Sequence, residues 1–136
     1  MIHITRRERF SSAHRLFVPE WSMEDNDDFF GACNNPNWHG HNYELFVTIK
    51  GEVNQQTGVL INLKDLSKIL NEKVISKVDH KNLNTEVSFL KDCVTSAEMI
   101  AIRIWNEIEE PIRDLGAELY KVKLIETENN YVEYYG

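Results

Sequence analysis

Two histidines, His39 and His41, flank a glycine within a turn-rich segment that runs from Cys33 to Tyr43. After Tyr43 the sequence Glu-Leu-Phe-Val-Thr-Ile-Lys alternates in the manner of a β-strand. Because side chains repeat every two residues in an extended chain, both imidazoles point to the same side at the start of this strand. Two imidazoles on one side are most of the ligand set of a metal ion.

A third imidazole, that of His14, lies at the end of the first predicted strand, while His39 and His41 open the second. If these strands pair antiparallel, the three imidazoles lie together. Three histidine ligands with a fourth position left for water or substrate are typical of a catalytic zinc site, and the chain has no Cys-x-x-Cys pair of the structural kind. The alternative is that His-Gly-His forms a surface turn and that His14 is an ordinary strand-end residue. The matched position of the third histidine favours the metal site.

Cys33 is a candidate nucleophile or base, because it precedes the predicted ligands in the same polar, turn-rich segment. A nearby dication would favour its thiolate form. The alternative is an inert packing residue, which is the commoner role of a free cysteine. We assign Cys93 to packing because it has no such neighbours.

Two further sets of acidic residues can take part in chemistry. Asp79 precedes His80, and a carboxylate can fix the tautomer of an imidazole and raise its basicity, although such dipeptides are common by chance. Glu126 shares one face of a predicted strand with Val122 and Leu124. A carboxylate on an apolar face needs a partner, which is either a structural group such as an arginine or a ligand with adjacent N–H donors.

The elements that position these residues follow from the alternating and helical patterns. Strands are expected at residues 2–14, 42–53, 119–127 and 131–135, and helices at 63–78 and from the Thr95-x-x-Glu98 capping box to Pro111, which bends or ends the second helix. Residues 17–38 are expected to form a long loop. The order strand, strand, helix, helix, strand, strand predicts a single α+β domain over residues 1–136, with a four-stranded antiparallel sheet and both helices on one face. Its open sheet edges favour oligomerisation.

The composition is that of an ordinary globular protein, with 136 residues, 42% hydrophobic and 27% charged. A net charge of -7 argues against nonspecific nucleic-acid binding but not against a small anionic substrate. The N-terminal residues lack the apolar run of a signal peptide, and no segment approaches membrane-spanning length. We therefore expect a cytoplasmic protein that acts on a small molecule without nucleic-acid or membrane partners.

Five segments, spread over nearly the whole chain, resemble the 6-pyruvoyl-tetrahydropterin synthase family, which includes the 6-carboxytetrahydropterin synthases of queuosine biosynthesis. They are residues 10–16, 33–43, 57–63, 78–83 and 126–130. The resemblance implies the T-fold, Zn²⁺ as cofactor and a homohexamer built from two trimers with active sites at subunit interfaces. The site residues implied by the resemblance are the metal ligands His14, His39 and His41, the catalytic residues Cys33, Asp79 and His80, and the substrate-binding residues Glu126, Thr95 and Ser96.

The resemblance also implies the reaction, in which 7,8-dihydroneopterin triphosphate loses triphosphate. We expect the 6-carboxytetrahydropterin product with acetaldehyde, because the chain is short and lacks extensions. The alternative is the 6-pyruvoyl product of the tetrahydrobiopterin-type pathway, which the spacing between Cys33 and His39 resembles more. The other classes of protein left open are a non-catalytic zinc-binding module and a zinc hydrolase acting on another phosphate ester. Trp38 departs from the small residue expected next to His39.

Overall fold

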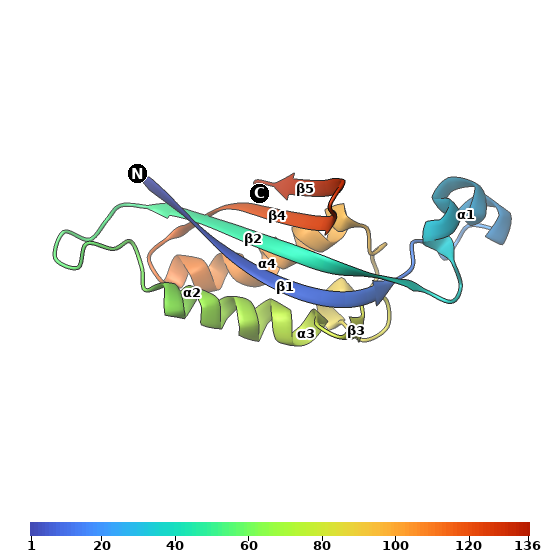
Figure 1. The fold of residues 1–136 in the computed structure, drawn as a ribbon, viewed down its shortest axis with the longest axis horizontal. Helices are drawn as coiled ribbons and strands as arrows, with labels where there is room; N and C mark the ends of the chain where they lie inside the picture. Colours follow the sequence, from blue (N-terminus) through green and yellow to red (C-terminus); the bar gives the residue numbers. More distant parts are fainter.

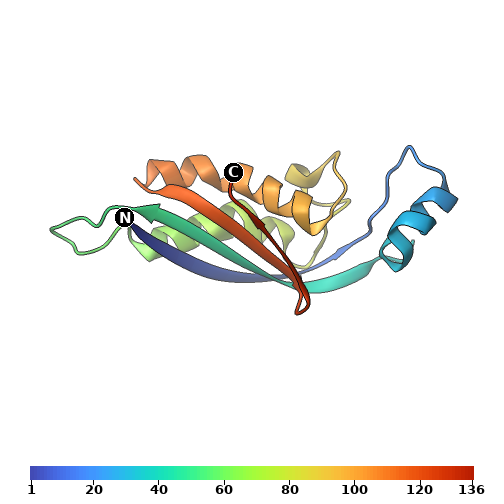
Figure 2. The same cartoon turned by 90° about the horizontal axis from the view of Figure 1, so that it is seen from above.

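The computed structural model describes residues 1–136, which form a mixed five-stranded sheet with helices packed on one face (Figures 1 and 2). Across the sheet the strands follow the order β3-β1-β2-β4-β5. The elements in chain order are β1 (Ile2–His14), α1 (Met23–Phe30), the 3-10 helix η1 (Gly31–Asn34), β2 (His39–Gly51), α2 (Leu63–Leu70), the π-helical turn η2 (Asn71–Ile75), α3 (Ser76–Val78), β3 (Lys81–Asn82), the 3-10 helix η3 (Ser88–Leu90), α4 (Ala97–Asp114), β4 (Glu118–Thr127) and β5 (Asn130–Tyr134). The α+β class and the placement of the helices on one face are as predicted.

β1 and β2 form a long antiparallel ribbon, in which Ile2 lies opposite Gly51 and His14 lies opposite His39. The segment that joins the two strands carries α1 and projects beyond the end of the ribbon (Figures 1 and 2). This register confirms that the end of the first strand lies beside the start of the second. His14 and His39 therefore lie at the base of the projecting segment.

The hydrophobic core lies between the sheet and the helices. The strand residues that face the helices and the apolar stripe of α4 are fully buried, and they include Leu45, Val47, Val122, Leu124, Ile100, Ile104 and Ile108. Burying one such side chain contributes about 1.5–3 kcal/mol relative to leaving it in water. The same face of the sheet carries the histidines, so the core fixes the frame in which they lie.

The predicted helix over residues 63–78 is confirmed as one continuous helical stretch, composed of α2, η2 and α3. Asn62 caps it, because its side-chain oxygen accepts a hydrogen bond of 3.0 Å from the Lys64 N–H. A single π turn, η2, interrupts the α-helical geometry. The helical stretch ends at Val78, and the Asp79–His80 dipeptide follows directly. No helix of the chain combines the length and the apolar character needed to cross a bilayer.

The predicted four-strand order was incomplete. A fifth strand, β3, pairs in parallel with β1, with Ser12 opposite Lys81 and Ala13 opposite Asn82. It has two residues and follows His80, whose φ of 58° places it in the left-handed region. A strand of two residues has no alternation for a sequence pattern to detect. The sheet is therefore mixed rather than purely antiparallel.

Three predictions about the helices also need correction. The expected loop over 17–38 contains α1 and η1. Ser22 caps α1 by accepting a hydrogen bond from the Asp25 N–H. The helix was not predicted because it is too short and polar to show an apolar stripe. Of the two outcomes expected for Pro111, the end of the helix is wrong, because Pro111 lies inside α4. The helix continues to Asp114 because Ile112 is fully buried against the core, which stabilises the last turn despite the lost N–H donor of the proline. Ser96, rather than Thr95, is the N-cap.

Candidate functional site

The register of β1 and β2 brings three imidazoles together. His14 and His39 are directly opposite each other, and His41 lies two residues further along the same face. The ring centroids are separated by 4.5 Å for His14–His39, 5.1 Å for His14–His41 and 5.0 Å for His39–His41. One nitrogen of each ring lies within 4.8 Å of the others, close enough for one ion to contact all three after small ring rotations. We call these three residues the histidine cluster.

His14 is held in one orientation by the residue before the α4 cap. Its Nδ1 donates to the Thr95 carbonyl over 2.7 Å, which leaves the lone pair of Nε2 free to bind a cation. Burial lowers the pKa of His14 to about 4, and the neighbouring imidazoles of His39 and His41 act in the same direction. Burial and His41 also lower the pKa of His39. His14 and His39 therefore present neutral imidazoles, which is the form that binds metal ions.

Two nitrogens of the cluster lack partners. His39 Nδ1 and His41 Nε2 are buried and have no hydrogen bond within the protein. Buried polar atoms without partners are rare in native proteins because each costs desolvation energy. A divalent cation would satisfy them, and a set of imidazole nitrogens suits Zn²⁺ among the biological cations. The residues present therefore fit a metal ion.

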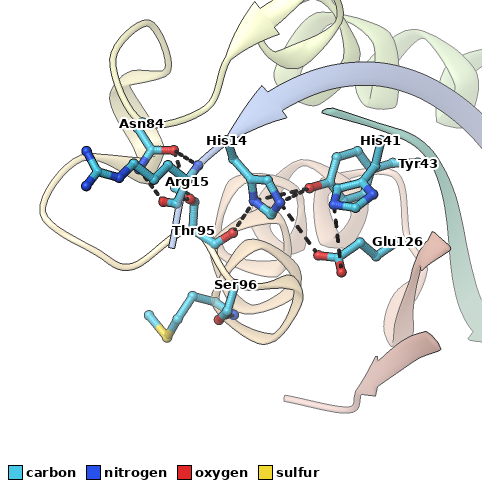
Figure 3. A network of polar contacts seen from close by, with 9 residues as sticks. His14, Arg15, His41, Tyr43, Asn84, Thr95, Ser96 and Glu126 are labelled. Carbon is cyan, nitrogen blue, oxygen red and sulfur yellow. Dashed lines mark hydrogen bonds and ion pairs between the residues drawn. The ribbon is translucent and has the colours of Figure 1, made fainter. Parts of the chain in front are cut away.

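Glu126 lies against the cluster from β4. Its carboxylate oxygens lie 3.9 Å from His14 Nε2 and 3.9 Å from His41 Nε2 (Figure 3). Glu126 also borders a cavity of about 360 Å³, which Ser96, Ala97 and Tyr131 help to line. The carboxylate on the apolar strand face thus has imidazoles on one side and an open cavity on the other. Glu126 and Ser96, both predicted to bind substrate, share this cavity.

Thr95 is fully buried, and its polar groups bond within the protein. Its carbonyl accepts from His14, and its hydroxyl donates to Asn84 Oδ1 over 3.0 Å. These bonds hold the His14 ring in place. Direct contact between Thr95 and a substrate stays a prediction.

Asp79 and His80 form a bonded pair on another part of the sheet. His80 Nδ1 lies 2.9 Å from Asp79 Oδ2, and the Ser11 N–H donates to Asp79 Oδ1 over 2.9 Å. The Ser11 N–H, with His80, holds the pKa of Asp79 below its ordinary value. His80 borders an open groove of about 520 Å³ together with Ser11 and Asn42. Strand alternation points the side chains of Ser11 and Asn42 away from the face that carries the cluster. His41 of the cluster nevertheless borders the same groove, so one chain brings His80 and one cluster histidine to a single groove.

Cys33 lies exposed in η1, at the end of the projecting segment. Its carbonyl accepts a hydrogen bond of 2.8 Å from the Leu16 N–H. The structure thus ties its main chain to the residues that follow His14. Its use as a nucleophile or base stays a prediction.

Tyr43 was missed as a neighbour of the cluster. It is 1% exposed, and its hydroxyl lies 3.3 Å and 3.4 Å from the two nitrogens of the His14 ring (Figure 3). Burial raises its pKa, so the hydroxyl stays protonated. The strand alternation that aligned His39 with His41 also places Tyr43 on the face that carries the cluster. This alternation could have predicted Tyr43 as a neighbour of the histidines.

The chain was compared with known proteins and family models. A family model described as 6-pyruvoyl tetrahydropterin synthase matches residues 3–136. A 6-pyruvoyl tetrahydrobiopterin synthase of Dictyostelium discoideum is 47% identical over 133 residues, which cover 98% of this chain and 95% of the relative. A putative 6-carboxy-5,6,7,8-tetrahydropterin synthase of Archaeoglobus fulgidus is 33% identical over 95 residues, 70% of this chain and 73% of the relative.

A solved structure shows the same fold. The Caenorhabditis elegans 6-pyruvoyl tetrahydropterin synthase superimposes with a TM-score of 0.93 at 37% identity, covering 99% of this chain and 95% of that chain. The agreement extends over the sheet, the helices and the segment that carries Cys33. The chain belongs to the 6-pyruvoyl tetrahydropterin synthase family, as its five sequence segments predicted.

Proposed function

We propose that the protein is a zinc-dependent lyase that converts 7,8-dihydroneopterin triphosphate into 6-pyruvoyl-tetrahydropterin with release of triphosphate. The observation that carries the proposal is a cluster of three imidazoles, two of which have buried nitrogens without a partner, in a chain that the family model matches from residue 3 to residue 136. A zinc-binding module without catalysis would not need the adjoining cavity and carboxylate.

The comparisons favour the 6-pyruvoyl product over the 6-carboxy product expected from the short chain. The relative named for the pyruvoyl product is 47% identical over 98% of the chain, whereas the relative named for the carboxy product is 33% identical over 70%. The short chain was therefore a poor guide to the product. The 6-carboxy product of the queuosine pathway is the competing outcome of the product assay.

His14, His39 and His41 would hold the zinc ion, which supplies Lewis-acid polarisation of the substrate's side-chain hydroxyls. Thr95 would keep His14 in the tautomer that binds the cation, through the 2.7 Å bond to Nδ1. Tyr43 packs against the same ring and closes the site toward the core.

Glu126 would anchor the pterin ring. The cavity of about 360 Å³ between the start of α4 and the β4–β5 hairpin lies in the usual size range for a small-molecule site. A carboxylate at its border can accept hydrogen bonds from the 2-amino group and the adjacent ring N–H of a pterin. Ser96, which lines the cavity beside it, offers a hydroxyl that already caps α4.

Cys33 and the Asp79–His80 pair would move the protons. Because Asp79 accepts from His80 Nδ1, the other ring nitrogen of His80 is left to accept a proton. His80 shares its groove with His41, whereas Cys33 lies outside that groove in the projecting segment, so a neighbouring subunit would complete the site. We propose that the chain forms the homohexamer of two trimers implied by the family, with its active sites between subunits.

The test is incubation of the purified, zinc-loaded protein with 7,8-dihydroneopterin triphosphate, followed by mass spectrometry of the products. We expect triphosphate and 6-pyruvoyl-tetrahydropterin, whereas acetaldehyde would mark the 6-carboxy route. No triphosphate release would overturn the enzyme proposal and leave the zinc-binding module. Phosphate release that survives Cys33→Ala would indicate the zinc hydrolase instead.

A further inference from the structure

Hydrogen bonds from two adjacent residues, Arg15 and Leu16, hold the main chain around Cys33 against the end of β1. The Leu16 N–H donates to the Cys33 carbonyl over 2.8 Å. Arg15 Nε donates to the next residue, reaching Asn34 O at 3.0 Å and Asn34 Oδ1 at 2.9 Å. These bonds connect η1, in the projecting segment, to the strand that ends in His14.

Asn34 connects Arg15 to helix α1 of the projecting segment. It is 2% exposed, and its Nδ2 donates to Asp27 Oδ1 on α1 over 2.7 Å. Both ends of its amide are thus engaged, one by Arg15 and one by Asp27. The Arg15 guanidinium also lies 4.6 Å from the centroid of the Phe17 ring, which fixes its direction. Hydrogen bonds from a charged guanidinium are stronger than those between neutral groups.

The main chain of Arg15 is fixed just as closely on the side of the histidine cluster. Its N–H donates to Asn84 Oδ1 over 3.0 Å, and Asn84 Nδ2 donates to the Arg15 carbonyl over 2.8 Å (Figure 3). Thr95 donates to the same Asn84 oxygen and accepts from His14. One continuous set of bonds therefore runs from His14 to the residue that follows Cys33.

We infer that Arg15 is a positioning residue that fixes Cys33 relative to the histidine cluster, acting through Asn34. Arg15 directly follows His14, so one short piece of main chain carries both a predicted metal ligand and the anchor of the thiol segment. The inference rests on the proposed use of Cys33 in catalysis. A misplacement of about 1 Å at a reacting group can cost about 10²-fold in rate. Loss of the bond between Arg15 and Asn34 should therefore lower kcat and leave substrate binding nearly unchanged.

The first experiment removes either partner of the bond, with Arg15→Gln and Asn34→Ala. We expect kcat to fall on the order of 10²-fold in each variant, with KM close to that of the parent and with the zinc content of the parent. Asn34→Ala removes the Oδ1 acceptor but keeps the main-chain oxygen of residue 34 as an acceptor for Arg15, whereas Arg15→Gln removes the donor to both oxygens. Both changes therefore weaken the same link, and the double variant should be no worse than the more damaging single variant. Arg113→Gln, in the last turn of α4, is the matched control and keeps the parent kcat.

The second experiment follows the thiol directly, in a Cys93→Ser background that leaves Cys33 as the remaining cysteine. Iodoacetamide alkylation of Cys33 is timed with zinc-loaded and with zinc-free protein. A cation held near a thiol increases its thiolate fraction, so zinc should accelerate alkylation in the parent. Arg15→Gln and Asn34→Ala should lose most of this acceleration, which a general loss of stability would not cause.

Parent-like kcat and a parent-like zinc effect on alkylation in both variants would overturn the inference. Loss of zinc from the variants would also overturn it, because Arg15 would then support the cluster rather than the thiol. Fully additive losses in the double variant would show that the two residues act separately. Full activity of Cys33→Ala would instead overturn the proposed function, so the two failures are distinguishable.

Discussion

Zinc binding should stabilise the folded protein through the three imidazoles, and removal of one of them should abolish most of that effect. A ligand present at 100 times its Kd stabilises the native state by about 2.7 kcal/mol. Unfolding entropy of about 2.1 cal/mol/K per residue over 136 residues corresponds to about 0.29 kcal/mol/K. We therefore expect zinc at this concentration to raise Tm by roughly 9 °C.

In His39→Ala one ligand is lost, and with it the buried Nδ1 that has no partner within the protein. Structural zinc sites gain about 10–16 kcal/mol from four ligands, so one ligand corresponds to about 3 kcal/mol, or roughly 150-fold in Kd. At the same zinc concentration the rise in Tm should shrink to about 1 °C.

The assay is differential scanning fluorimetry of chelator-treated protein, with and without added zinc. His3→Ala is the matched control, since His3 is exposed and packs on Tyr120 with ring centroids 4.5 Å apart, away from the cluster. It should keep the full zinc effect. An equal zinc-induced rise in parent and His39→Ala protein would refute the assignment of the cluster as the metal site.

Three further predictions follow from the separation of the site residues and from the backbone. Mixing inactive Cys33→Ala and His80→Ala subunits by dissociation and reassembly should restore part of the activity if each site combines two subunits; absence of any recovery would count against the shared site. The pKa of Asp79 is lower in the folded protein than the unfolded value of 3.8, so its charged bond to the Ser11 N–H stabilises the protein above pH 3.8 and is lost as pH falls through the folded pKa. In urea unfolding, Asp79→Asn should therefore be less stable than the parent at pH 7, and the difference in stability should shrink in acid. A difference that widens in acid would contradict this. Trp38 has a φ of 67°, which glycine adopts without strain, so Trp38→Gly should be more stable than Trp38→Ala by about 1 kcal/mol in the same urea assay, and the reverse order would contradict the strain argument.

The histidine cluster was predictable because it depends on local geometry. Alternation along β2 aligns His39, His41 and Tyr43, and one hairpin pairing adds His14. Neither step needs knowledge of the rest of the fold. The same holds for the helix over 63–78, whose apolar residues recur at helical spacing and which Asn62 caps through its side chain.

The missed features depend on contacts between distant segments. β3 exists because the chain after His80 meets the edge of β1 at Ser12, and its two residues show no pattern of their own. α4 continues through Pro111 because Ile112 is buried against the sheet, an example of tertiary packing that outweighs helix propensity. The spacing between Cys33 and His39 indicated the 6-pyruvoyl branch, which the comparisons also favour, whereas the short chain indicated the 6-carboxy branch.

The proposed site residues are spread over two faces of the sheet for a physical reason. Side chains of neighbouring residues on β1 point in opposite directions, so the strand that supplies His14 to the core face presents Ser11 and the bonded Asp79–His80 pair at the opposite groove. Burial keeps the imidazole of His14 neutral, whereas His80 lies exposed at the groove. His41 borders the same groove, so the buried and the exposed environments meet at this residue. Assembly of subunits would complete the site around a substrate while each environment retains the solvation that its chemistry needs.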